Sequence, residues 1–201
     1  MSADGGAAGP TKSEMSAGFR LLGEDTLHDG PIISLRRTKL ADPDGNAFER
    51  EVVRHPGAVS VVPLLEDHDG ADRPVVVMLR QYRAAIDAEL LEIPAGKRDV
   101  AEEPPEATAH RELAEEVGFA AGSLELLARF YNSPGFSDEH SFTFLARHLT
   151  VVDVSPQGVE ERHMAMEHVA LDDVATMIAD GRLTDAKSII ALLLTLRRLG
   201  R

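Results

Sequence analysis

Residues 96–119 carry the clearest helix boundaries in the chain, together with charges that a helix built only for stability would avoid. Pro104 and Pro105 suit the first turn of a helix, where a missing amide hydrogen costs no hydrogen bond. Gly118 suits the left-handed residue that follows the last turn. These signals predict a helix over about residues 104–117.

The final turns of this expected helix are acidic. Glu112, Glu115 and Glu116 stand three and four residues apart, so their side chains project from one face of the helix. They repel one another at the negative end of the helix dipole, where Lys or Arg would be favoured by about 0.3–1 kcal/mol each. A solvated acidic surface is the alternative. The spacing and the unfavourable helix end instead favour a site for a hard divalent cation, with Arg111 placed to pair with Glu115.

The run RELAEEVGF, residues 111–119, resembles the signature of the Nudix hydrolases, which is preceded by a glycine and a further glutamate. One feature departs from that pattern. The pattern places five residues between its glycine and its first glutamate, which from Gly96 leads to Glu102. It places seven residues between that glutamate and its arginine, which from Arg111 leads back to Glu103, so the loop holds one extra residue. We take Glu103 as the equivalent acid, because a helix fixes spacing and a loop absorbs insertions. The role of Glu102 stays open.

The resemblance implies a fold and a metal site. The fold class is α+β, a Nudix-type α/β/α sandwich with a mixed sheet, here preceded by a small antiparallel N-terminal β module. The implied metal ligands are the carbonyl of Ala95 with Glu112 and Glu116, and Glu115 is a closely placed third acid. The implied cofactor is Mg²⁺, with Mn²⁺ as the second candidate.

We call the Nudix signature, which ends at Phe119, the box. A proline fifteen residues beyond it, Pro134, is similar to the mark of the ADP-ribose pyrophosphatases within this family. The resemblance implies Mg²⁺-dependent hydrolysis of ADP-ribose to AMP and ribose 5-phosphate. It also implies a general base from a loop outside the box, for which Glu139 is slightly preferred over Glu160 and Glu161. Arg111 completes the residues that we assign to catalysis.

Further residues occupy places where ADP-ribose hydrolases hold their substrate. Arg83 can pair with a phosphate in bidentate fashion, and Glu92 can accept hydrogen bonds from adenine or ribose. Arg54 and Arg37 are weaker candidates, for which surface salt bridges are an equal alternative.

Composition limits the partners. The formal net charge of −13 argues against a nucleic-acid or anionic-membrane partner, which would require clustered Lys and Arg. It leaves a small nucleoside diphosphate sugar possible, because a bound metal and a few arginines reverse the local potential. The absence of cysteine fits a reducing cytoplasm. No apolar run approaches the roughly twenty residues of a membrane span, so we expect a cytoplasmic protein.

We expect a disordered tail at residues 1–17, a β module at 18–55 and a Nudix hydrolase domain at 56–201. Strands are predicted in the module at 19–30, 31–42 and 47–55, with a hairpin turn at 42–46. Such a small sheet is insecure alone, so we expect a homodimer in which the module completes the partner's site. In the remaining chain the patterns predict strands at 58–65, 74–82, 124–132 and 140–150, and helices at 171–181 and 184–200.

Two other functions stay open. The chain could act on another nucleoside diphosphate sugar, or it could be a non-catalytic sensor of ADP-ribose. The sensor is the weaker alternative, because the sequence has no basic helix-turn-helix segment and its box glutamates are intact.

Overall fold

The computed structural model describes residues 18–66, 73–153 and 163–201. These form two compact units: residues up to His55 together with Gly135–Ser137, and the rest of the chain. Within the described ranges, no helix is long and apolar enough to cross a membrane.

The first unit contains a three-stranded antiparallel sheet in the order β1-β2-β3. The turn between β2 and β3 forms as expected: Asp42 accepts hydrogen bonds from the backbone and side chain of Asn46, and Gly45 has a φ of 91°. Most side chains of β1 are exposed. The three predicted strands are confirmed, with the bounds Arg20–Asp29 for β1, Ser34–Ala41 for β2 and Ala47–Arg54 for β3.

The second unit is built on a seven-stranded mixed sheet in the order β10-β5-β4-β9-β8, with β6 paired to β5 and β7 paired to β4. The pair β4·β9 is parallel, and the other pairs are antiparallel. The strands are β4 (Ala58–Leu65), β5 (Val75–Arg83), β6 (Ala88–Glu92), β7 (Ala95–Lys97), β8 (Phe119–Tyr131), β9 (His140–Val151) and β10 (Ala165–Ala170).

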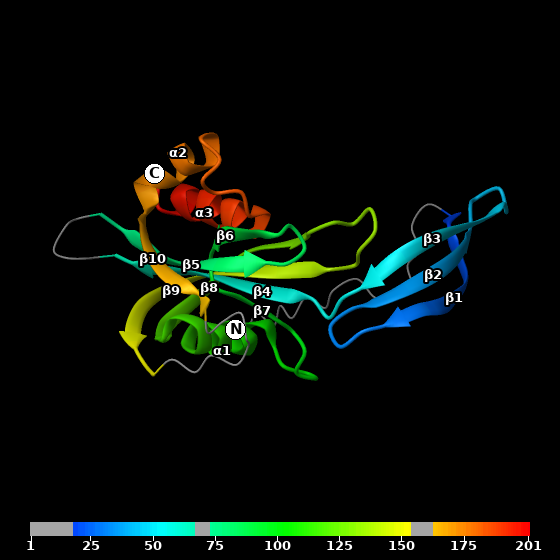
Figure 1. The fold of residues 1–201 in the computed structure, drawn as a ribbon, viewed down its shortest axis with the longest axis horizontal. Coiled ribbons are helices and arrows are strands. Elements are labelled where there is room, and N and C mark those ends of the chain that lie inside the picture. Colours follow the sequence, from blue (N-terminus) through cyan, green and yellow to red (C-terminus); the bar gives the residue numbers. More distant parts are fainter. Residues whose placement is uncertain (1–17, 67–72, 154–162) are drawn as a thin grey trace, which may run out of the picture. The chain divides into compact units, whose positions relative to one another are not determined.

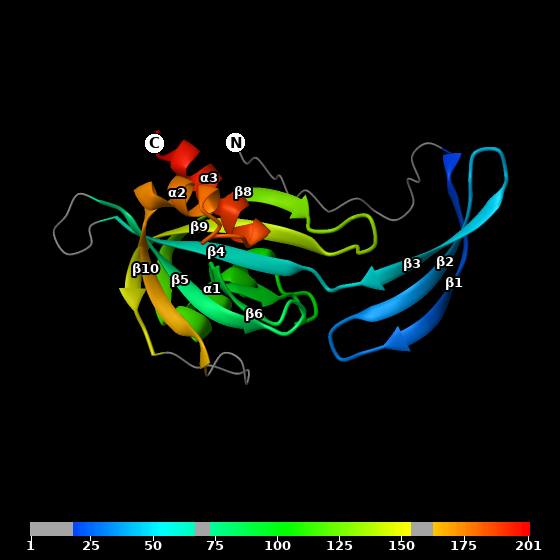
Figure 2. The same cartoon turned by 45° about the horizontal axis from the view of Figure 1, so that its top comes forward.

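Helices cover both faces of this sheet. Helix α1 (Pro105–Val117) lies on one face, and α2 (Val174–Ala179) and α3 (Ala186–Arg198) lie on the other (Figures 1 and 2). Neighbouring residues of β4 therefore serve different cores: Val61 packs with the cluster on the α1 side and Val62 with the cluster on the α3 side. Burial on both faces explains the unbroken apolar runs of the central strands. The α/β/α sandwich with a mixed sheet is confirmed.

Three details differ from the sequence prediction. Strand β10 was not predicted, because the run AMEHVA is short and has no flanking turn signal. The helix expected at 171–181 is a 3₁₀ turn, Leu171–Asp173, followed by the six residues of α2. Strand β8 also begins earlier than expected, directly after Gly118, whose φ of 68° reverses the chain at the end of α1.

Candidate active site

Helix α1 and the short strand β7 bring the predicted metal-ligating residues together. Ala109, Leu113 and Val117 bury one stripe of the helix against the sheet. Glu112 and Glu116 follow the same side of the helix toward β7. Glu112 is only 8% exposed and packs so closely on Gly96 that a Cβ atom at that position would overlap its carboxylate. The backbone N–H of Ala95 donates a hydrogen bond to Glu116 Oε2 at 2.9 Å.

Arg111 holds several of these acids in place. Its Nη1 lies 2.7 Å from Glu112 Oε1 and 3.1 Å from Glu115 Oε2, and its Nη2 lies 3.3 Å from Glu103 Oε2. Burial by itself lowers the pKa of Arg111. The hydrogen bond to Glu103 and the charges of Glu112 and Glu103 outweigh that effect, so the pKa lies above its ordinary value. Arg111 is therefore a permanent cation that orients three carboxylates.

The structure distinguishes the contacts of Glu103 from those of Glu102. Thr108 Oγ1 donates to Glu103 Oε2 at 2.7 Å, and this bond, followed by the one from Arg111, lowers the pKa of Glu103. Glu102 is exposed and adopts a left-handed φ of 62°. A turn closed by the hydrogen bond from Glu103 N to Val100 O at 3.2 Å absorbs the insertion. Glu103, and not Glu102, thus contacts Arg111.

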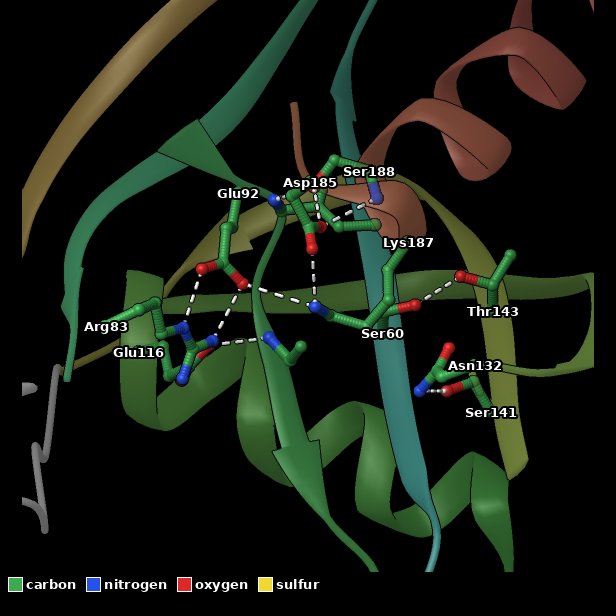
Figure 3. A network of polar contacts seen from close by, with 12 residues as sticks. Ser60, Arg83, Glu92, Glu116, Asn132, Ser141, Thr143, Asp185, Lys187 and Ser188 are labelled. Atoms are coloured by element: carbon green, nitrogen blue, oxygen red, sulfur yellow. Dashed lines mark hydrogen bonds and ion pairs between the residues drawn. The ribbon is translucent and has the colours of Figure 1, made fainter. Parts of the chain in front are cut away.

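A second polar cluster lies at the opposite end of the Glu92–Ala95 segment (Figure 3). Arg83 donates from Nε to Glu92 Oε1 at 2.6 Å and from Nη2 to Glu92 Oε2 at 2.7 Å. Lys187 Nζ lies 3.3 Å from Glu92 Oε2 and 2.7 Å from Asp185 Oδ1. Asp185 caps α3 by accepting from Ser188 N and Oγ at 2.9 and 2.7 Å. We call Arg83, Glu92, Lys187 and Asp185 the α3 network.

This arrangement of acids around a short strand agrees with the comparison against known families. The sequence model of the NUDIX domain matches residues 54–192. The chain belongs to the Nudix hydrolase family. The resemblance predicted from the box residues is thereby confirmed, and so is the prediction of an enzyme.

Similar proteins of this family match most of this chain. An ADP-ribose pyrophosphatase of Bacillus subtilis is 35% identical over 86% of this chain and 90% of its own length. An ADP-ribose pyrophosphatase of Mycobacterium tuberculosis is 38% identical over 87% and 82%. A solved structure described as an ADP compounds hydrolase has a TM-score of 0.76 at 21% identity and covers 91% of this chain and 96% of its own, which supports the fold.

Nudix hydrolases use divalent metal ions, and the donor set here fits that chemistry. Carboxylate oxygens are the ligands that hard cations prefer. Because Gly96 has no Cβ atom, the Glu112 carboxylate fits against its backbone between α1 and β7. Among the described residues, no three acidic or imidazole side chains already converge as a metal-binding group. In this arrangement Glu112 bonds to Arg111, and Glu116 accepts a hydrogen bond from Ala95 N.

The remaining predicted residues fall in three places. Glu139 lies directly before β9, and its carbonyl accepts a hydrogen bond from Asn132 N at 3.1 Å across the loop that contains Pro134. Arg37 and Arg54 belong to the first unit, where they pair with Glu49 and Glu24. Glu160 and Glu161 lie outside the described residues.

Two findings on the α3 side go beyond the sequence prediction. Arg83 and Glu92 were each expected to face the substrate, but they pair with each other, and Glu92 is only 2% exposed. Lys187, Asp185 and Ser188 were expected only as the first turn of a helix. Lys187 is 95 residues from Glu92 along the chain, so no local spacing could have linked them.

Proposed function

We propose that this Nudix hydrolase cleaves the pyrophosphate bond of ADP-ribose to give AMP and ribose 5-phosphate. The observation that carries the proposal is the gathering of Glu112 and Glu116 against Ala95 and Gly96. The two similar ADP-ribose pyrophosphatases, which match nearly the whole chain, support the choice of substrate.

The metal in this proposal is Mg²⁺, with Mn²⁺ as the second candidate. Glu112, Glu116 and the carbonyl of Ala95 would hold it, and Glu115 is the additional acid nearby. Bound there, a divalent ion screens the phosphate oxygens and lowers the pKa of water. Arg111 keeps the carboxylates oriented before the ion arrives, since it bonds to Glu112 and Glu115 at once.

Glu139 is the proposed general base, which takes the proton from the attacking water. The loop that carries it is close in space to the residues that follow β7, because Arg98 Nη1 lies 3.2 Å from Nε2 of the adjacent His140. Glu160 and Glu161 are the alternatives. No covalent intermediate is needed, because water attacks the phosphate directly.

Arg83 and Glu92 remain the proposed substrate-binding residues of the second unit, and Arg37 and Arg54 those of the first. Arg83 and Glu92 are paired through Nε and Nη2 of the guanidinium, so binding of a ligand competes with this pair for Arg83. Arg83 is the more exposed partner, with 38% of its side chain accessible against 3% for Glu92.

A homodimer belongs to the same proposal. The sheet β1-β2-β3 leaves Leu21 and Leu22 57% and 54% exposed, and a small sheet gains stability by covering such side chains. An obligate interface would bury more than about 2,000 Å². Sedimentation of the full chain over a dilution series tests this, and a monomer at micromolar concentration contradicts it. Location in the cytoplasm and the absence of a nucleic-acid partner also stay predictions.

The activity is tested by turnover of a panel of nucleoside diphosphate compounds with product identification. We expect ADP-ribose to have the highest kcat/KM and to yield AMP with ribose 5-phosphate. A GDP-sugar or another diphosphate compound with the higher kcat/KM would replace ADP-ribose as the substrate. Binding of ADP-ribose without turnover in the presence of Mg²⁺ and Mn²⁺ would favour the sensor.

A further inference from the structure

In the α3 network the buried Glu92 contacts two cations, Arg83 and Lys187, and it shares Lys187 with Asp185. Arg83 bonds to both carboxylate oxygens at 2.6 and 2.7 Å, and Lys187 Nζ lies 3.3 Å from Oε2. Removing the sole partner of a buried charge is strongly destabilising, because the charge stays desolvated and unpaired. A second cation makes it possible for the first to leave.

The two cations differ in how firmly they are held. Lys187 is 18% exposed and also pairs with Asp185 at 2.7 Å. Asp185 is itself fixed by the N–H and hydroxyl of Ser188 in the first turn of α3. Lys187 is therefore anchored on both sides, between Glu92 and Asp185.

Arg83 is the more exposed of the two cations. Its side chain is 38% exposed and it lies at the end of β5. It also lies beside the acids of α1: its pKa is raised first by the hydrogen bond to Glu92, and the charge of Glu116 adds to this effect. Figure 3 shows the Arg83 and Glu116 side chains next to each other, with Lys187 on the other side of Glu92.

We propose that Lys187 is a positioning residue that keeps Glu92 paired while Arg83 turns from Glu92 to the pyrophosphate of the substrate. The proposal rests on the proposed function, since it assigns Arg83 to substrate binding. With Lys187 in place, freeing Arg83 leaves Glu92 with a cation within 3.3 Å. Without Lys187, the same turn would strand a buried carboxylate, so Arg83 would stay on Glu92 and the substrate would bind more weakly.

The test compares Lys187→Met with Lys187→Arg in steady-state kinetics. We expect Lys187→Met to raise KM on the order of tenfold with kcat within about twofold, because Arg83 would serve the ground state and the transition state alike. Lys187→Arg keeps the charge and should restore KM. Calorimetry with ADP-ribose and no divalent metal should show the same order of increase in Kd. If Lys187→Met melts below the assay temperature, Lys187→Gln replaces it.

A double-mutant cycle separates this role from a general structural one. In a Glu92→Gln background no charge has to be held, so Lys187→Met should change KM less than about twofold. A tenfold increase in that background as well, or a failure of Lys187→Arg to restore KM, overturns the proposal. If the wild-type protein hydrolyses a different nucleoside diphosphate compound, only the choice of ADP-ribose fails. The variants are then compared on that compound, because the pyrophosphate is common to the panel.

Discussion

The two polar clusters beside the Glu92–Ala95 segment differ in charge balance. In the acidic cluster at α1, Arg111 forms ion pairs with three carboxylates, those of Glu103, Glu112 and Glu115, and Glu116 is a fourth acid on the same helix. The α3 network sets two cations against two carboxylates. A balanced set can be stabilised by the folded chain alone. A set with excess negative charge gains most when an external cation arrives.

The segment between the two clusters is held at every residue. The Glu92 side chain bonds to Arg83, and Ile93 N–H donates to Ser188 Oγ at 2.9 Å. The carbonyl of Pro94 accepts from Val61 N, and the N–H of Ala95 donates to Glu116, both at 2.9 Å. The balanced cluster thus helps to fix the segment that the acidic cluster uses for binding.

Replacing a carboxylate of the acidic cluster should have the largest effect on activity. Glu116→Gln is expected to lower kcat by several orders of magnitude, because a neutral amide is a poorer ligand for Mg²⁺. The melting temperature should stay or rise, since a repulsion is relieved. Glu106→Gln, an exposed change in the first turn of the same helix, is the matched control. Near-normal turnover of Glu116→Gln at saturating Mg²⁺ would contradict the metal assignment.

We expect the acidic cluster to bind the metal, and Glu139 to take the proton from the attacking water. Glu139→Gln should then lower kcat by roughly 10²–10⁴ while metal affinity is preserved, the range for loss of a general base. Kinetics and Mn²⁺ titration on the same sample measure both quantities. The same kcat loss in Glu160→Gln or Glu161→Gln, with Glu139→Gln active, would place the base in the later loop.

A methyl group added at Gly96, which lies on β7 and is not one of the acids, should disturb the acidic cluster. Gly96→Ala places a Cβ where the Glu112 carboxylate lies, so the carboxylate has to move. We expect metal affinity to fall by about 10–100-fold, as for other changes that reorient a ligand. Isothermal titration with Mn²⁺ measures it. Gly135→Ala is the control, since a Cβ there meets nothing within 4 Å. Unchanged affinity in Gly96→Ala would mean that Glu112 is not a ligand in this position.

The smallest effect on activity is expected from Asp185→Asn in the α3 network. Unlike Glu116→Gln, this change should lower the stability of the fold. Asp185→Asn keeps an oxygen that can cap α3 but removes the charge that Lys187 pairs with. We expect a loss of roughly 1.5–3 kcal/mol in the free energy of unfolding at pH 7, the value of hydrogen bonds to charged groups. Asp180→Asn, at an exposed pair with Arg182, should cost less than about 1 kcal/mol.

The pH dependence of that loss has a defined sign. Burial raises the pKa of Asp185, but Lys187 and the bonds from Ser188 outweigh it, so the folded-state pKa lies below the ordinary 3.8. The stability it contributes is present above the unfolded-state pKa and is lost as the pH falls through the folded-state value. The difference in unfolding free energy between wild type and Asp185→Asn, measured by urea unfolding, should therefore start to shrink as the pH falls below about 4. A difference that does not shrink between about pH 5 and about pH 2 would mean that packing, and not charge, is responsible.

The sequence by itself determined the features that depend on neighbouring residues. The prolines at 104 and 105 and the left-handed Gly118 bound α1, and the spacing of Glu112 and Glu116 places both acids on one helix face. The family followed from the same residues. These features depend on local dihedral preferences and on the helical repeat, which do not require the rest of the chain.

The tertiary structure decided what depends on long-range pairing. It selected Glu103 over Glu102, because only Glu103 reaches Arg111 once the inserted residue is turned outward. It paired β10 with β5 and joined Lys187 to Glu92 across 95 residues. It also set Arg83 on Glu92. A charged side chain bonds to the partner that folding brings within about 3 Å, and that choice is fixed by packing of the sheet and α3.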